Sequence, residues 1–129
     1  MAVPPNAKLI EGEIADYYLD EDGILYSYSK NPKRTVELIR NNIALVKKIT
    51  HNQIVPLLIF LCDSPIPDKA TRNYSSEQLP HVYKAMAMVG KPGLTQLIMN
   101  VLFKLKQAPI PMKSFSKEAD AREWLKQYL

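Results

Sequence analysis

Two short apolar segments decide the fold of this sequence: Ile54-Val55-Pro56-Leu57-Leu58-Ile59-Phe60-Leu61-Cys62 and Lys84-Ala85-Met86-Ala87-Met88-Val89. The first is almost entirely apolar between polar neighbours, which is typical of a central strand covered on both faces. Its proline is compatible with this role because it lies near the start of the segment. The second segment is open to two interpretations. It is either another buried strand or the end of a preceding helix, since alanine and methionine are good helix formers.

Toward the N-terminus, the pattern predicts an antiparallel hairpin. Residues 8–19 are partly apolar on both faces, and residues 24–29 alternate with a period of two. Between these runs, Asp22-Gly23 is a strong signal for a tight hairpin turn. Residues 1–7 include two adjacent prolines and are predicted to be a disordered tail, so that residues 8–129 form the domain.

Helical periodicity predicts the elements that connect the strands. Thr35 is the expected N-cap of a first helix, which two lysines close at residues 47–48. Ser75, with Gln78 three residues later, has the spacing of a capping box for a second helix. Apolar residues recur at helical spacing over residues 94–105, which is the clearest helix in the sequence.

The C-terminal part adds one more strand and one more helix. Residues 112–115 are expected to form a short last strand, and Ser116 is expected to cap a closing helix that runs to Leu129. The whole order predicts an α/β fold with a single domain. Its mixed, mostly parallel sheet has about five strands, begins with the antiparallel hairpin and carries helices packed on it. The predicted core draws on all of these elements: Ile43, Val46, Leu58, Phe60, Met86, Met88, Leu94, Val101, Phe115 and Trp124.

This order and certain residues resemble the STAS/SpoIIAA-like family of small α/β domains. The residues in question are Ile10-Glu11-Gly12 at the opening, the 84–89 segment, and Ala121-Arg122-Glu123-Trp124-Leu125 near the end. The last run is similar to an Ala-x-x-Trp-Leu pattern in an uncharacterised bacterial branch of the family. The resemblance favours a strand over residues 84–89. It implies a SpoIIAA-like fold and a non-enzymatic regulatory or protein-interaction module in bacterial signalling.

The resemblance also raises the question of a phosphorylation switch. Anti-anti-sigma members carry a phosphoacceptor serine in an Asp-Ser-Ser-Gly-like motif, and this sequence lacks that motif. The candidates that remain in the corresponding region are Ser75, Ser76 and Thr71, with Arg72 as a charge partner for the phosphate. The simpler interpretation of Ser75 is a helix cap.

The residues with catalytic or metal-binding chemistry are few and poorly spaced. Cys62, Asp63, His51 and His81 show no ligand spacing such as Cys-x-x-Cys or His-x-x-x-His. A cysteine at the end of a buried strand is usually a small apolar side chain. The sequence therefore predicts no catalytic site, no metal site and no cofactor, and we expect a protein that is not an enzyme.

Binding surfaces are the alternative. On the helix after Gly93, Met99 and Phe103 lie one turn apart and away from the face that packs on the sheet, with Lys106 nearby. They either pack under the chain's own segment 108–111 or form a patch for a protein partner, a second copy of the chain, or an apolar ligand or lipid. The ligand would occupy a pocket between the sheet and the helix 94–106. Lys33 and Arg34, before the first helix, are candidates for binding an anion, and the simpler interpretation is a solvated basic turn.

Composition limits the remaining classes. The 129 residues carry a net charge of +4, which is too mild and too dispersed to predict nucleic-acid binding. No apolar run approaches the roughly 20 residues of a membrane span, although peripheral contact with a membrane stays open. The single cysteine, Cys62, fits a reducing compartment, and a cytoplasmic location is expected.

Overall fold

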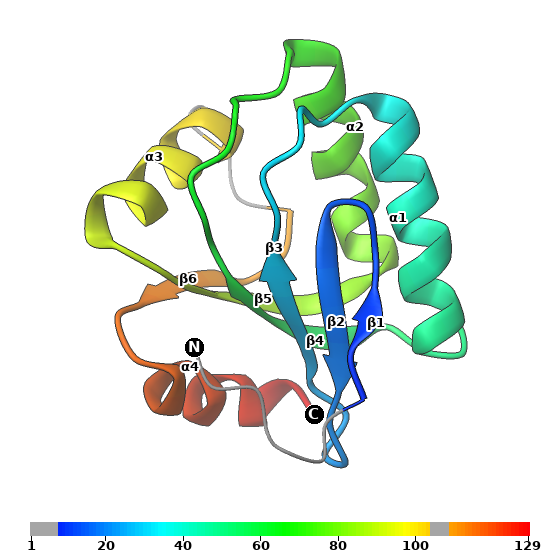
Figure 1. Ribbon diagram of the computed structural model, residues 1–129. Helices are drawn as coiled ribbons and strands as arrows, with labels where there is room; N and C mark the ends of the chain where they lie inside the picture. The colour runs from blue at the N-terminus through cyan, green and yellow to red at the C-terminus, as the bar shows by residue number, and fades with distance from the viewer. Residues whose placement is uncertain (1–7, 104–108) are drawn as a thin grey trace.

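Figure 1 shows the computed structural model, which describes residues 8–103 and 109–129, and the side chains of residues 8–97 and 109–129. A six-stranded sheet has its strands in the order β1-β2-β3-β4-β5-β6, so each strand lies beside its neighbours in sequence. The first three pair antiparallel, and β3 to β6 pair parallel. The α/β class and the opening hairpin are thus confirmed. The predicted tail at residues 1–7 lies outside the described residues.

The sheet has one strand more than expected, because the predicted strand over residues 8–19 is divided. It forms β1 (Ile10–Glu11) and β2 (Ala15–Leu19), which pair with each other antiparallel. The chain turns back at Gly12, where a Cβ atom would lie 2.6 Å from the Ala15 carbonyl oxygen and 2.9 Å from Leu45 Cδ2. Only glycine allows so close an approach.

The hairpin between β2 and β3 (Leu25–Ser29) forms as predicted. Asp20 Oδ1 accepts hydrogen bonds from the backbone N–H groups of Asp22 and Ile24, each at 2.9 Å. Gly23 has φ of 96°, a left-handed conformation that favours glycine. The aspartate and the glycine of the sequence signal thus each have a defined role in the turn.

The two apolar segments are neighbouring parallel strands, β4 (Val55–Phe60) and β5 (Tyr83–Val89). This confirms a strand over the second segment. The register between them shifts between Val55 and Leu57, at Pro56, which has no N–H to give to a ladder. The last strand, β6 (Met112–Phe115), adds to β5 in the predicted position.

Helices cover both faces of the sheet (Figure 1). On one face lie α1 (Val36–Ile49), α2 (Lys69–Gln78) and α3 (Pro92–Phe103). On the other lies α4 (Glu118–Leu125), which packs on β4 and β5. Short 3-10 helices follow α2 at Leu79–His81 and α4 at Lys126–Tyr128.

Of the three predicted helix N-caps, one is confirmed and two are wrong. Thr35 caps α1 as predicted, since its Oγ1 accepts a hydrogen bond from the Leu38 N–H at 3.1 Å. Asp68 rather than Ser75 caps α2, because its carboxylate accepts from the Thr71 N–H at 2.8 Å. Lys117 rather than Ser116 occupies the N-cap position of α4, without a side-chain cap. The helix α4 thus begins one residue later than predicted, whereas α2 begins seven residues earlier, at Asp68.

The predicted core is largely confirmed. Val46, Leu58, Phe60, Met86 and Met88 are buried. Four others are half-buried: Ile43, Leu94, Phe115 and Trp124. The side chain of Val101 lies outside the described residues. The core has two parts, one on each face of the sheet. Val46 belongs to the cluster beneath α1, and Leu125 belongs to the cluster beneath α4.

Candidate functional site

A cavity of about 220 Å³ lies between the sheet and the three helices on its α1 face. The sheet contributes residues from β2 to β6, and the helices contribute residues from α1, α2 and the first turns of α3. Most of the lining is apolar. The described lining residues are Ile14, Ala15, Tyr17, Ser27, Ser29, Arg34, Ile39, Asn42, Ile43, Leu57, Ile59, Leu61, Cys62, Ser64, Pro65, Ile66, Pro67, Thr71, Arg72, Ser75, Gln78, Leu79, Val82, Tyr83, Met86, Met88, Leu94, Leu97 and Met112.

The cavity exists because small side chains stand where large ones would fill the space. Ala15 on β2, with Ser27 and Ser29 on β3, line it from the sheet. On the helical side, α2 contributes Thr71 and Ser75, whose short side chains cannot reach across as leucine would. The composition of this helix is largely polar, and Thr71 is its one buried residue.

One wall of the cavity carries a buried polar cluster. The Tyr17 hydroxyl donates a hydrogen bond to Asn42 Oδ1 at 2.8 Å, and Ser27 and Tyr83 hydrogen-bond with the same hydroxyl. Burial raises the pKa of Tyr17 to about 12, although these hydrogen bonds lower it. Burial also raises the pKa of Tyr83 well above its ordinary value. The cluster is therefore neutral at ordinary pH, and it offers hydroxyl and amide groups to a bound molecule.

Arg34 brings a positive charge to the lining. It lies one residue before the α1 N-cap, and its guanidinium donates to the backbone carbonyls of Lys30 at 3.0 Å and Ile14 at 3.3 Å. A longer contact of 3.5 Å reaches the Pro32 carbonyl. Burial lowers the pKa of Arg34, while the nearby Cys62 and Tyr17 raise it. Arginine nevertheless keeps its charge at any ordinary pH.

The cavity opens to solvent beside the loop before α2. Ile66 in this loop is 54% exposed and Leu97 on α3 is 45% exposed, yet both line the cavity. Two large apolar side chains at the rim give an apolar molecule a route to the interior.

The two residues predicted to bind an anion separate in the structure. Arg34 lines the cavity, whereas Lys33 is exposed and lies near the Asp68 carboxylate, whose pKa it helps to lower. The prediction of the pair as one site is therefore not supported by their placement. The sequence signal located the arginine, but it could not show which way the two neighbouring side chains point.

The three phosphorylation candidates all lie on α2. Thr71 is buried in its first turn, and Ser75 and Ser76 are half-buried near its C-terminal end. A phosphate on either serine would gain no stabilisation from a helix N-terminus, because the negative end of the helix dipole is closer. Phosphorylation itself stays a prediction.

The predicted patch on the helix after Gly93 lies outside the described side chains. The side chains of Met99 and Phe103 and the whole of Lys106 lie outside the described residues. The predicted pocket beneath helix 94–106 is found in part, because Leu94 and Leu97 line the cavity. Most of the lining, however, comes from α1, α2 and the sheet. Three residues of the polar wall were not predicted from the sequence: Tyr17, Asn42 and Ser27. The only signal for them was Ser27 itself, a serine in a strand whose other face carries tyrosines.

Two findings on metal binding and membrane spanning hold for the described residues, 8–103 and 109–129. Among them, no group of three or more His, Cys, Asp or Glu side chains is close enough to hold a metal ion. Likewise, no helix in the part of the chain that the structure describes is long and apolar enough to cross a membrane.

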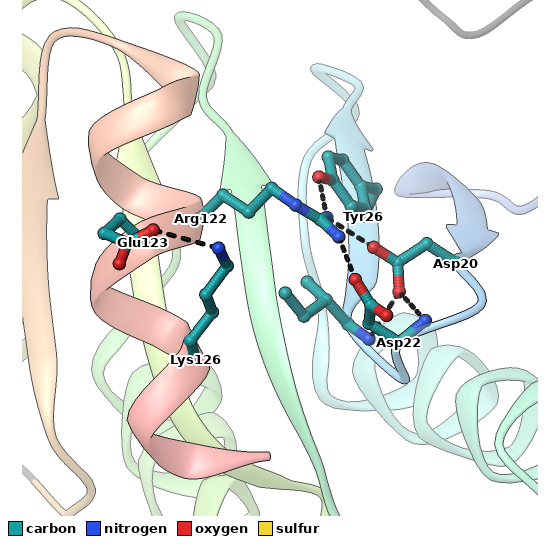
Figure 2. Close-up of polar contacts among 7 residues, drawn as sticks. Asp20, Asp22, Tyr26, Arg122, Glu123 and Lys126 are labelled. Atoms are coloured by element: carbon teal, nitrogen blue, oxygen red, sulfur yellow. Dashed lines mark hydrogen bonds and ion pairs between the residues drawn. The ribbon is translucent and has the colours of Figure 1, made fainter.

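A second polar cluster lies on the opposite face of the sheet, where Figure 2 shows Arg122 of α4 reaching the β2–β3 hairpin. Its guanidinium forms ion pairs with Asp20 and Asp22 and donates to the Tyr26 hydroxyl at 2.6 Å. These partners raise the pKa of Arg122, with Asp20 contributing most. The same carboxylate of Asp20 holds the turn, so this cluster joins the last helix to the first hairpin. We interpret it as a structural tie.

Comparison with known proteins agrees with this fold. A family model described as a domain of unknown function, DUF7793, matches residues 17–129. A crystal structure of an uncharacterized protein of the DUF3478 family from Shewanella loihica PV-4, described as having a SpoIIAA-like fold, is 21% identical, with a TM-score of 0.62. The match covers 90% of this chain and 95% of that one, and it shows the fold alone. The predicted fold family is thus confirmed. None of the curated proteins matches the chain.

Proposed function

We propose that this chain, which belongs to the DUF7793 family and has a SpoIIAA-like fold, is a non-enzymatic module that binds a small apolar molecule. The observation that carries the proposal is the cavity of about 220 Å³ on the α1 face of the sheet. A domain that acted by surface recognition alone would have no need of an open space beside its core. Packed interiors seldom contain such spaces, because the atoms around a void lose their contacts.

The size of the cavity limits the ligand. An apolar cavity of about 150 Å³ holds benzene, and pockets for drug-sized ligands start at about 300 Å³. By the same ratio, this cavity has room for roughly nine non-hydrogen atoms. We therefore expect a short aliphatic chain or a single substituted ring. A longer molecule would extend past Ile66 and Leu97 into solvent.

The chemistry of the lining supports binding rather than catalysis. Among the described lining residues there is no His, Asp, Glu or Lys. Cys62 and the serines therefore have no general base in the lining to activate them as nucleophiles. The buried hydroxyl of Tyr17 is held to Asn42, which suits a fixed hydrogen-bonding wall.

The regulatory protein-interaction function rests on the family resemblance alone. It stays a prediction, and it is compatible with ligand binding, since a bound molecule can alter a surface through the helices that enclose it. The cytoplasmic location likewise stays a prediction.

Two variants on one helix test the proposal. Ser75 lines the cavity, and Ser76, the next residue, is similarly half-buried but is not among the described lining residues. We expect 1-heptanol to shift amide signals of residues around the cavity in NMR spectra of the unmodified chain. The substitution Ser75→Leu should abolish those shifts, and Ser76→Leu should preserve them.

Native mass spectrometry of gently purified chain adds an independent observation. We expect a fraction of the chain to carry a small bound molecule that is lost from the Ser75→Leu variant. If heptanol caused no shifts around the cavity, or if both serine variants bound it equally, the proposed function would be wrong.

A further inference from the structure

The charge of the lining indicates the chemical class of the ligand. Arg34 and Arg72 are the charged side chains among the described lining residues, and neither aspartate nor glutamate is present there. We propose that the ligand is a small apolar carboxylate, and that Arg34 binds its carboxylate group. The inference rests on the proposed function, because it concerns what occupies the same cavity.

The Arg34 guanidinium has N–H groups without an acceptor among the described residues. Both N–H groups of Nη2 are used, on the carbonyls of Ile14 and Lys30, and Nη1 makes its one long contact with Pro32. The Nε–H and one N–H of Nη1 have no acceptor among the described residues. The guanidinium forms no ion pair in the part of the chain that the structure describes. A half-buried cation that has lost much of its hydration gains most from an anion brought to it.

The backbone holds this guanidinium in place before any ligand arrives. Its carbonyl partners belong to the segment before β2 and to the end of β3, which are themselves linked by the Lys30 N–H and Ile14 carbonyl at 2.9 Å. Little side-chain entropy therefore remains to be lost on binding. The N-terminus of α1 begins at the adjacent Thr35, and its dipole adds to the positive potential.

Arg72 is the contrasting case. Its Nη1 donates to the Pro67 carbonyl at 2.7 Å, and it lies near the Asp68 carboxylate, whose pKa it helps to lower. Its charge is therefore partly neutralised by the chain itself. Lys33 is exposed and lies near the same aspartate. Of Arg34, Arg72 and Lys33, Arg34 is thus the one without a carboxylate nearby among the described residues.

The test compares heptanoate with heptanamide, two molecules of the same shape that differ in charge. We expect NMR titrations at neutral pH to show heptanoate binding at least about tenfold more tightly, which is the range of a hydrogen bond to a charged group. Arg34→Gln should remove most of this preference by lowering heptanoate affinity by a much larger factor than heptanamide affinity, and continued binding of heptanamide shows that the cavity is intact. Arg34→Lys keeps the positive charge but lacks the planar pair of N–H donors of a guanidinium. Its preference for heptanoate should therefore lie between that of the unmodified chain and that of Arg34→Gln.

Arg72→Gln is the matched control and should reduce the preference by less than about threefold, because its charge is already partly neutralised. Equal affinity for heptanoate and heptanamide would overturn the carboxylate inference and leave apolar binding standing. Equal losses at the two arginines would overturn the assignment to Arg34. Failure of both molecules to bind would instead contradict the proposed function.

Discussion

Replacing Ser75 with leucine should stabilise the fold, which is unusual for a substitution that enlarges a partly buried side chain. Leucine adds roughly three carbon atoms in place of the hydroxyl, and each is worth about 0.8 kcal/mol when it is buried. Ordering the leucine side chain costs about 0.5–1 kcal/mol, and its better helix propensity returns a few tenths. The expected gain in the free energy of unfolding is therefore about 1.5–2 kcal/mol, because a cavity of about 220 Å³ has room for the added atoms.

Urea denaturation followed by circular dichroism measures this gain, and thermal denaturation should show a rise in Tm of about 6 °C. Ser76→Leu, on the same helix and outside the described lining, should change stability by less than about 0.5 kcal/mol. If Ser75→Leu destabilised the chain by about 1–3 kcal/mol, the usual result of overpacking, the space would already be filled and the reasoning would fail.

Two further predictions concern the polar clusters. Arg122→Gln should lower stability by about 1–2 kcal/mol, because it leaves the Asp20 carboxylate, whose side chain is 7% exposed, without its ion-pair partner. Lys126→Gln, which breaks the exposed pair between Glu123 of α4 and the 3-10 helix that follows, should cost less than about 0.5 kcal/mol in the same urea assay. The pKa of Tyr17, raised from 10.0 to about 12, means that its contribution is fully present below pH 10 and is lost as the pH rises toward 12. Tyr17→Phe should therefore show a shallower fall in stability between those two pH values, and an unchanged slope would contradict this.

The sequence was most informative where a pattern is local. The hairpin turn depends on Asp20 and Gly23, and the start of α1 depends on Thr35 and its hydrogen bond to Leu38. The two buried strands could be identified because a helix-sandwiched parallel sheet requires continuous apolar runs. In the first of these runs, even the position of Pro56 agrees with the register shift found there.

Features that depend on several elements at once could not be predicted. The division of the first strand follows from the approach of Leu45 on α1 to Gly12, which is a contact between distant residues. The cavity is the difference between the space that the sheet and three helices enclose and the volume of their side chains, and no sequence periodicity indicates it. Ser75 was assigned to a cap because its spacing to Gln78 is a local pattern, whereas its place in the lining depends on how α2 lies over the sheet.

The two faces of the sheet differ in how completely they are filled. Beneath α4, aromatic rings pack against one another, as in the stacked pair of Tyr28 and Phe60 with ring centroids 5.0 Å apart. The tie through Arg122 closes that side around the hairpin. The α1 face instead combines a polar wall at Tyr17 with an open interior. This asymmetry is the basis for proposing ligand binding at the α1 face and structural support at the other face.

A crystal structure of the chain grown with heptanoate tests the central claim most directly. The account predicts ligand density inside the α1-face cavity, with the alkyl chain among Leu57, Met88 and Leu94 and the carboxylate on the guanidinium of Arg34. A cavity closed by the protein's own side chains, or heptanoate bound only elsewhere on the surface, would contradict it.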